Sequence, residues 1–481
     1  MAFAKYLVKK SISAIQAESE KSELKRTLSA ANLVSLGIGC IIGAGIFVMT
    51  GTAAANYAGP AIVLSFVIAG LCCAFAGLCY AELASMLPVS GSAYSYSYAS
   101  LGELFAWIMG CLLLLEYGVA SATVAVGWSG YVVSFLSNFG IVIPPSLTTP
   151  TFSLNHETHS LIYNGGFNLP ALVGILMMSV LLVVGVKESA TVNNVIVAIK
   201  VSVVLLFIGV GAFYVDTANW HPFIPENTGV DGQYGWSGIL RGAGVVFFAY
   251  VGFEAVSTAA QEARNPKRDV PIGILGSLIV CTILYIAVAL VLTGVVPYTM
   301  LNVPDPMAKA VDVVGLPWLS FLIKIGAIAG LTSVMMVLLY GQTRIFYTMS
   351  RDGLMPAAFS KVHPKFQTPY INTIVVGVII AIVAATTPID ILGDLVSLGT
   401  LTAFSIICFT VLYLRKTQPD MARPFTVPFS PYFPVLGILF CGYLIYGLLS
   451  NPVTVKFYLV YITVGLVVYF AYSAKHSKIS N

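Results

Sequence analysis

The sequence predicts an all-α polytopic membrane protein with about twelve transmembrane helices in one large membrane domain. Of its 481 residues, 58% are hydrophobic and only 9% are charged, whereas about 25% of the residues of a soluble domain are charged. The hydrophobic residues gather in runs of the ~20 residues that a helix needs to cross a bilayer. Lys and Arg are unevenly divided between the loops on the two sides of these runs.

The predicted spans follow one another along the chain, each bounded by Gly, Pro or charged residues. They lie at 31–51, 60–87, 103–138, 169–186, 193–215, 237–260, 272–296, 318–350, 371–388, 391–414, 431–450 and 454–473. We group them as five spans in 31–215, five in 237–414 and a final pair in 431–473. The tail at 1–30 is polar and lacks the apolar core of a cleavable signal peptide, so we expect the first span to direct insertion.

The basic residues predict the orientation. If the N-terminal tail is cytoplasmic, nineteen Lys and Arg residues lie on that side, and only Lys309 and Lys456 lie outside. Cytoplasmic loops accumulate Lys and Arg. We therefore expect an even number of spans, with the tails 1–30 and 474–481 both cytoplasmic and the chain in the inner (plasma) membrane of the cell. Three further basic residues, Lys200, Arg241 and Lys324, fall within spans.

Several functional classes find no support in the sequence. All five histidines lie in loops or the C-terminal tail, and the eight cysteines lie in apolar runs without a CxxC pair, so we expect no metal site and no cofactor. His156, Glu157 and His159 resemble a metal trio but fit a solvated outer loop better. The sequence contains no phosphate-binding loop, so ATP-driven transport is not expected. With a net charge of only +4, a nucleic-acid partner is not expected either, and no catalytic constellation indicates an enzyme.

Two spans are interrupted at mid-membrane depth. The first contains Gly37, Gly39, Gly43 and Gly45, and a glycine inside a helix costs about 1 kcal/mol relative to alanine. Close helix packing would also explain glycines, but their spacings of two, four and two do not form one stripe. The sixth span carries a second interruption in 247–254, where Gly252 and Glu254 break the apolar run. We therefore expect an unwound segment in each span.

The interrupted spans are five apart, so a five-span repeat would place its second copy in the inverted orientation, as in many secondary transporters. Broken helices that face each other at the midplane offer free N–H groups and positive dipole ends to an anion. Their unwound carbonyl groups can receive a cation. A zwitterionic amino acid satisfies both, which favours an amino acid carrier embedded in the lipid bilayer.

Three ionisable residues, Glu116, Lys200 and Glu254, lie near the centre of their spans. A charge there costs at least ~3 kcal/mol, so each needs a partner or a neutral form. Lys200 is either a proton carrier, because burial favours its neutral form, or a structural cation bonded to carbonyl groups. Glu116 either joins Lys200 in a proton-coupling network or bonds to nearby backbone. Glu254 either caps the inner half of span six or takes part in substrate choice.

Five sequence segments together resemble the amino acid-polyamine-organocation (APC) superfamily, and more narrowly a bacterial member of its cationic amino acid transporter branch. They are the glycine-containing first span, Pro88–Tyr96, Phe248–Phe253, Arg264–Pro266 and Ser350–Leu354. The resemblance extends over nearly the whole chain. It implies the leucine-transporter-like fold, in which two inverted five-helix repeats and two extra helices move by alternating access.

The resemblance also implies a substrate site. The substrate carboxylate would meet the backbone at Ile41, Gly43, Ala44 and Gly45, and its amine would meet carbonyl groups at Phe248, Ala249 and Val251. Phe248 would also close the site from outside. Lys200 would stand where sodium-coupled relatives hold a sodium ion, and Leu338 would limit the pocket to small substrates.

We therefore expect proton-coupled uptake of small or medium neutral L-amino acids such as alanine. Transport of arginine or lysine is the main alternative, because Glu254 is the one candidate acidic partner for a cationic side chain. Obligate exchange, with Lys200 purely structural, also stays open. The predicted outer loops lack a cysteine that could link the chain to a glycoprotein subunit, so we expect no obligate partner of that kind.

Overall fold

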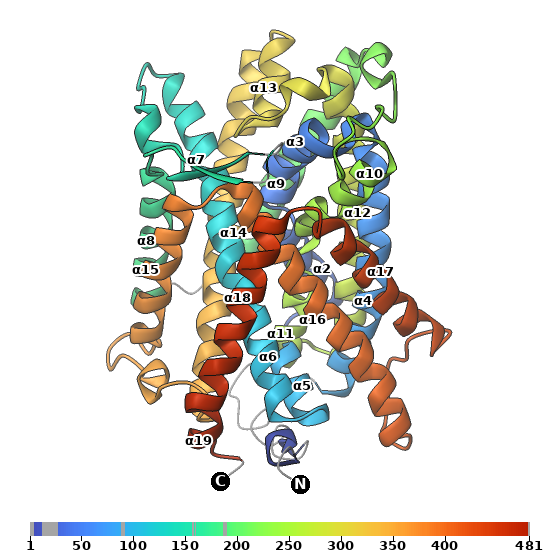
Figure 1. The fold of residues 1–481 in the computed structure, drawn as a ribbon, viewed down its shortest axis with the longest axis vertical. Helices are drawn as coiled ribbons and strands as arrows, with labels where there is room; N and C mark the ends of the chain where they lie inside the picture. Colours follow the sequence, from blue (N-terminus) through green and yellow to red (C-terminus); the bar gives the residue numbers. More distant parts are fainter. Residues whose placement is uncertain are drawn as a thin grey trace.

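The computed structural model describes residues 4–11, 27–87, 92–155, 158, 160–185 and 190–479. Helices in this part of the chain run mostly along the long axis of the molecule (Figure 1). Part of the predicted resemblance motif, 88–91, lies outside the described residues, as do His156, Glu157, His159, Lys187 and most of the 1–30 tail.

The elements alternate long helices with short 3₁₀ and π-helical turns. In the first half of the chain they are η1 (Ala4–Leu7), α2 (Ala30–Ile41), η2 (Gly45–Met49), α3 (Thr50–Ala53), η3 (Ala54–Ala58), η4 (Gly59–Ala61), α4 (Ile62–Met86), α5 (Ser92–Ser100), α6 (Glu103–Leu113), η5 (Leu114–Val119), α7 (Ala120–Ser137), η6 (Pro145–Leu147), β1 (Phe152–Asn155), β2 (Ser160–Tyr163), α8 (Leu169–Val184), α9 (Ala190–Gly211), η7 (Ala212–Tyr214) and η8 (Thr217–Trp220). The two strands form an antiparallel hairpin in which Phe152 pairs with Tyr163.

The second half of the chain is helical throughout its described elements. They are α10 (Gly235–Val246), η9 (Phe247–Tyr250), α11 (Ala255–Thr258), η10 (Ala260–Glu262), α12 (Pro266–Val295), η11 (Tyr298–Met300), α13 (Pro306–Val313), α14 (Pro317–Arg351), η12 (Ala357–Ser360), α15 (Tyr370–Thr386), α16 (Ile389–Thr417), α17 (Tyr432–Leu448), α18 (Pro452–Val468), η13 (Tyr469–Ser473) and α19 (Ala474–His476).

Eight helical runs within the described residues are long and apolar enough to cross a membrane. They are Gly45–Met86, Glu103–Ser137, Val192–Tyr214, Gly235–Thr258, Pro266–Val295, Pro317–Arg351, Ile389–Thr417 and Pro452–His476. Shorter apolar helices are Ala30–Ile41, Leu169–Val184, Tyr370–Thr386 and Tyr432–Leu448. Together they confirm the predicted polytopic helical class.

Burial separates central helices from peripheral ones. The apolar window of Gly235–Thr258 is 100% buried, whereas that of Pro452–His476 is only 11% buried. The peripheral helices expose large apolar side chains, among them Ile379 on α15 and Val460 on α18. Such apolar outer faces suit contact with lipid. The fully buried sixth span, which contains the second interruption, lies at the centre of the bundle.

Both predicted interruptions are confirmed. Helix α2 ends at Ile41, Ile42 is extended (φ −72°, ψ 97°), and helical structure resumes at Gly45. In the sixth span α10 gives way to η9, after which Val251 is extended. Gly252 then takes φ +117°, a left-handed conformation that side chains disfavour. The chain re-enters a helix at α11.

Candidate functional site

The two unwound segments pack directly against each other in the middle of the bundle. A Cβ atom on Gly45 would lie 2.2 Å from the Cα atom of Ala249. A Cβ atom on Gly252 would lie 3.0 Å from the carbonyl oxygen of Cys40. Glycine is required at Gly45 because the backbone of Ala249 leaves no room for a side chain. At Gly252 the contact is tight and the backbone conformation, φ +117°, also disfavours a side chain.

Tyr285 on α12 links the two segments. Its hydroxyl group lies 2.8 Å from the carbonyl oxygen of Ile41 and 2.8 Å from that of Ala249, and the side chain is fully buried. Because both helices break here, these two carbonyl groups have no backbone N–H partner within their own helix. The tyrosine therefore supplies a hydrogen-bond donor that both breaks require. Nothing in the sequence distinguishes Tyr285, since a tyrosine in an apolar span is typical of an ordinary core residue.

A small cavity opens where the two breaks meet. Its lining residues are Cys40, Ile41, Gly43, Ala44, Gly45, Ala120, Val124, Phe248, Val251, Val334 and Leu338. All of these side chains are apolar or thiol-bearing, so the lining carries no charge. The cavity combines backbone polar groups at the breaks with an apolar wall from α7 and α14. Such a mixture suits a ligand with a zwitterionic head and an apolar side chain.

Seven of the predicted substrate-site residues line this cavity: Ile41, Gly43, Ala44, Gly45, Phe248, Val251 and Leu338. Ala249 and Glu254 do not line the cavity. The Ala249 carbonyl group is linked to the cavity residue Ile41 by the hydroxyl group of Tyr285, which contacts both carbonyl oxygens. Four further cavity residues were not predicted from the sequence: Cys40, Ala120, Val124 and Val334. Small and aliphatic residues in apolar spans carry no sequence signal that would distinguish a cavity wall from helix packing.

Lys200 lies beside the first break. Its ammonium group donates to the carbonyl oxygen of Gly39 at 2.8 Å, and the residue is 1% exposed. A Cβ atom on Gly330 of α14 would lie 3.1 Å from the Lys200 side chain, so the lysine is packed between α2 and α14. Gly39 belongs to the last turn of α2, so the Lys200 ammonium group binds the end of that helix, next to the first break.

Glu116 and Glu254 form a second buried polar group near the breaks. Both residues are fully buried, and neither oxygen of the Glu116 carboxyl group has a hydrogen-bond partner among the described residues. Glu254 accepts a hydrogen bond from the Gly252 N–H at 3.0 Å, so it satisfies the break itself rather than capping α11. A carboxyl group buried in an apolar interior needs a partner or a neutral form, because burial penalises its charge.

Comparison with known proteins identifies the family. A family model described as amino acid permease matches residues 28–471. The chain belongs to the amino acid permease family. Membership of the APC superfamily, predicted from the motifs, is thereby confirmed. This permease is a transporter, not an enzyme, and a multi-pass membrane protein whose family handles amino acids.

Three relatives illustrate the range of the family. The permease is 49% identical over 467 residues to the branched-chain amino acid permease BcaP of Bacillus subtilis, which covers 97% of both chains. It is 47% identical over 472 residues to the methylthioribose transporter of the same organism, covering 98% of both. It is also 42% identical to the chloroplastic cationic amino acid transporter 9 of Arabidopsis thaliana over 425 residues, which is 87% of this chain and 72% of that protein.

Proposed function

We propose that the permease imports small or medium neutral L-amino acids together with protons by alternating access. The observation that carries this proposal is the uncharged cavity at the junction of the two broken helices. The start of η2 at Gly45 offers backbone N–H groups to a carboxylate, and carbonyl groups of the second break can accept the amine.

The substrate side chain would lie against Ala120, Val124, Val334 and Leu338, which are all apolar. Burying a guanidinium or ammonium group there without a partner would cost several kcal/mol. A neutral aliphatic side chain instead gains about 25 cal/mol per Å² of buried apolar surface. One relative is a branched-chain amino acid permease, which supports this substrate class.

We further propose twelve spans in two inverted repeats of five, 31–215 and 237–414, followed by the pair in 431–473. Ala30–Ile41 and the start of Gly45–Met86 form one span interrupted by the first break, and Gly59 with φ +59° divides that span from α4. When the shorter apolar helices are counted as well, the chain would cross the membrane twelve times.

Both ends of the described chain lie on one side of the proposed membrane. Lys10 contacts the carboxylate of Asp352 at 3.0 Å, and the Lys478 N–H donates to the Asp352 carbonyl at 3.1 Å. The sequence predicts nineteen Lys and Arg residues on the side of the two tails, so we assign that side to the cytoplasm and the permease to the plasma membrane.

Proton coupling would use Lys200 and the Glu116–Glu254 pair. Protonated Lys200 donates to Gly39, so loss of its proton would replace a charge-assisted hydrogen bond to the end of α2 by a weaker neutral one. Glu116 and Glu254 would take up and release a proton beside the second break. Each break therefore has its own titratable neighbour, which is the arrangement that coupling of proton and substrate movement requires.

A ligand screen tests the substrate class. Purified protein would be heated with each of the twenty L-amino acids and with methylthioribose, and the shift in Tm recorded. Stabilisation by alanine, valine, leucine or isoleucine is expected. Stabilisation by arginine and lysine alone would transfer the permease to the cationic class, and a response only to methylthioribose would reject amino acid transport.

Uptake into proteoliposomes tests coupling. A pH gradient, acidic outside, should drive accumulation of a labelled neutral amino acid by the wild type but not by Lys200→Ala or Glu116→Gln. Lys324→Ala is the matched control, because Lys324 is also buried and donates to a backbone carbonyl, that of Ser134, but lies away from the breaks. Accumulation that needs preloaded amino acid and ignores the gradient would establish exchange instead.

A further inference from the structure

Helix α16 is joined to other helices by an ion pair near each of its ends. Asp394 lies near its start and Arg415 near its end. At 1.5 Å per residue the helix rises ~30 Å between these positions, which matches the ~30 Å thickness of the hydrocarbon core. The two ion pairs therefore lie near opposite surfaces of the membrane.

The outer cluster is centred on Asp394. The Arg241 guanidinium of α10 contacts its carboxylate at 2.5 Å, and the two side chains are 3% and 1% exposed. Asn451 and Thr454, at the start of α18, donate to the same carboxylate oxygen at 3.1 and 3.2 Å. Arg241 also lies over the ring of Tyr57 in η3. This cluster therefore ties the outer ends of both interrupted spans to α16 and α18.

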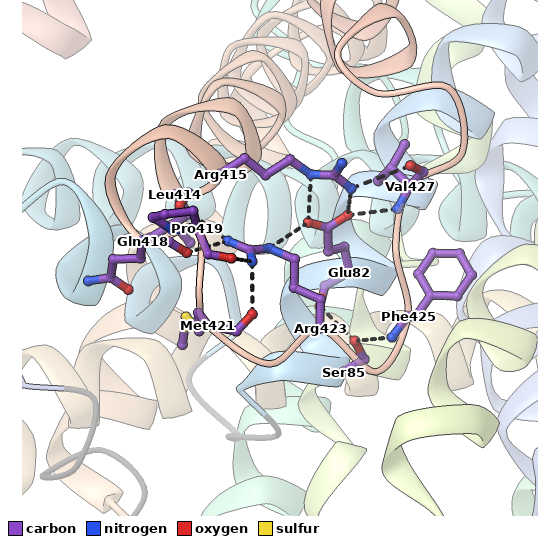
Figure 2. Close-up of polar contacts among 10 residues, drawn as sticks. All are labelled: Glu82, Ser85, Leu414, Arg415, Gln418, Pro419, Met421, Arg423, Phe425 and Val427. Atoms are coloured by element: carbon purple, nitrogen blue, oxygen red, sulfur yellow. Dashed lines mark hydrogen bonds and ion pairs between the residues drawn. The ribbon is translucent and has the colours of Figure 1, made fainter.

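The inner cluster is centred on Glu82, as Figure 2 shows. Arg415 contacts the Glu82 carboxylate through two nitrogens, at 2.5 and 3.1 Å. Arg423 lies 3.6 Å from it, and the Val427 N–H donates to it at 2.7 Å. Glu82 is 1% exposed, and its helix α4 is held to α16 and to the segment that follows α16.

The partners of α16 are the helices that hold the substrate site. Helix α10 leads into the second break. Helix α4 contacts that break directly, because its Phe66 carbonyl accepts from the Tyr250 hydroxyl at 3.0 Å and its Tyr80 ring packs against the Phe253 ring. Each cluster thus connects α16 to the parts of the molecule that surround the cavity.

We propose that the two clusters are the outer and inner gates of the permease, and that they open alternately. Opening the cavity to the outside requires the Arg241–Asp394 pair to separate, while the Glu82 cluster keeps α16 in place on the inside. Opening to the cytoplasm reverses these roles. The inference rests on alternating access as the transport mode, and with both clusters closed the structure represents the occluded state.

The gates differ in their exposure to solvent. The Arg415 side chain is 28% exposed, whereas both partners of the outer pair are nearly inaccessible. Salt screens exposed charges more strongly than buried ones. Raising the ionic strength should therefore favour opening on the inner side.

Native Cys40, which lines the cavity, reports which gate is open. Vesicles of defined orientation, without substrate, would be treated with a membrane-impermeant methanethiosulfonate reagent, and modification of Cys40 measured by mass spectrometry. Asp394→Asn should raise the rate of labelling from outside several-fold, and Arg415→Gln should raise it several-fold from inside.

Matched controls remove a similar charge without breaking a gate. Asp231→Asn neutralises an exposed carboxylate that lines, together with Arg241, a small cavity near the outer cluster. Lys416→Gln neutralises the exposed residue next to Arg415. Neither should change labelling. Equal rises on both sides for either gate variant, no rise in either, or the same rises in the controls would overturn the proposal.

Milder variants keep the test decisive if a gate variant does not fold. Thr454→Val removes one hydrogen bond to Asp394, and Arg415→Lys keeps the charge opposite Glu82 but cannot make the contact through two nitrogens. Each should raise labelling on its own side by a smaller factor, and a rise on the opposite side would contradict the assignment. Because labelling needs no transport, a failed gate proposal is distinguishable from a wrong substrate or coupling ion.

Discussion

At the scale of single residues, the site depends on groups that satisfy backbone atoms released by the two breaks. Tyr285 serves the carbonyl groups of Ile41 and Ala249, Lys200 serves Gly39, and Glu254 serves the Gly252 N–H. An unpaired backbone group in an apolar interior costs about 1–3 kcal/mol. The polar side chains near the cavity therefore stabilise the unwound backbone.

Replacing Tyr285 with phenylalanine should destabilise the permease by about 1–3 kcal/mol, because two carbonyl groups lose their shared donor. A lowered Tm and weaker stabilisation by amino acid are expected in a thermal unfolding assay. Tyr80→Phe is the control, since the buried Tyr80 hydroxyl has no hydrogen-bond partner among the described residues. Equal effects of the two substitutions would show that Tyr285 is an ordinary core residue.

Replacing Leu338 with alanine should enlarge the cavity and shift preference toward larger neutral amino acids. Competition uptake with alanine, leucine and phenylalanine would measure this, with an expected change in selectivity of at least about tenfold, since one methylene group in an apolar pocket is worth about 1–3 kcal/mol. Leu339→Ala is the control, because Leu339 is equally buried but does not line the cavity. Similar selectivity in both variants would remove Leu338 from the site.

At the scale of elements, an interrupted helix needs a residue that can take the unusual backbone conformation and leave room for its neighbour. Gly252 meets both needs, with φ +117° and only 3.0 Å between its would-be Cβ atom and the Cys40 carbonyl. The second break is therefore fixed by the first break as well as by its own sequence.

Gly252→Ala should abolish stabilisation by amino acid and reduce uptake at least tenfold, because the strained residue also pushes the two breaks apart. Uptake and thermal shift would be measured together. Gly442→Ala, on α17, is the control: nothing lies within 4 Å of its would-be Cβ atom, and alanine favours helix. Normal uptake by Gly252→Ala would contradict the role of this break.

At the scale of the whole molecule, the distribution of charge predicts the orientation of the chain in the membrane. The interrupted sixth span lies in the most buried part of the bundle, and α18 lies at its edge. The two ends of the described chain come together where Lys10 and Lys478 both contact Asp352, which agrees with the prediction that both tails lie on one side.

Orientation is testable by labelling engineered cysteines in intact cells. Val142→Cys, at a position that is 79% exposed, should react with an impermeant reagent added outside. Lys361→Cys, also exposed, should react only after the cells are opened. The native cysteines supply the background, since all but the partly buried Cys111 are buried. The reverse pattern would place both ends of the chain outside.

The sequence by itself determined the membrane class, the approximate spans and both interruptions, because these depend on local composition: apolar runs, glycine and isolated charges. It also led, through the resemblance, to seven of the cavity residues. Only the tertiary structure brought Tyr285 to two carbonyl groups and joined Glu82 to Arg415 and Arg241 to Asp394. These partners lie far apart in the chain, and a single sequence holds no record of which distant helices pack side by side.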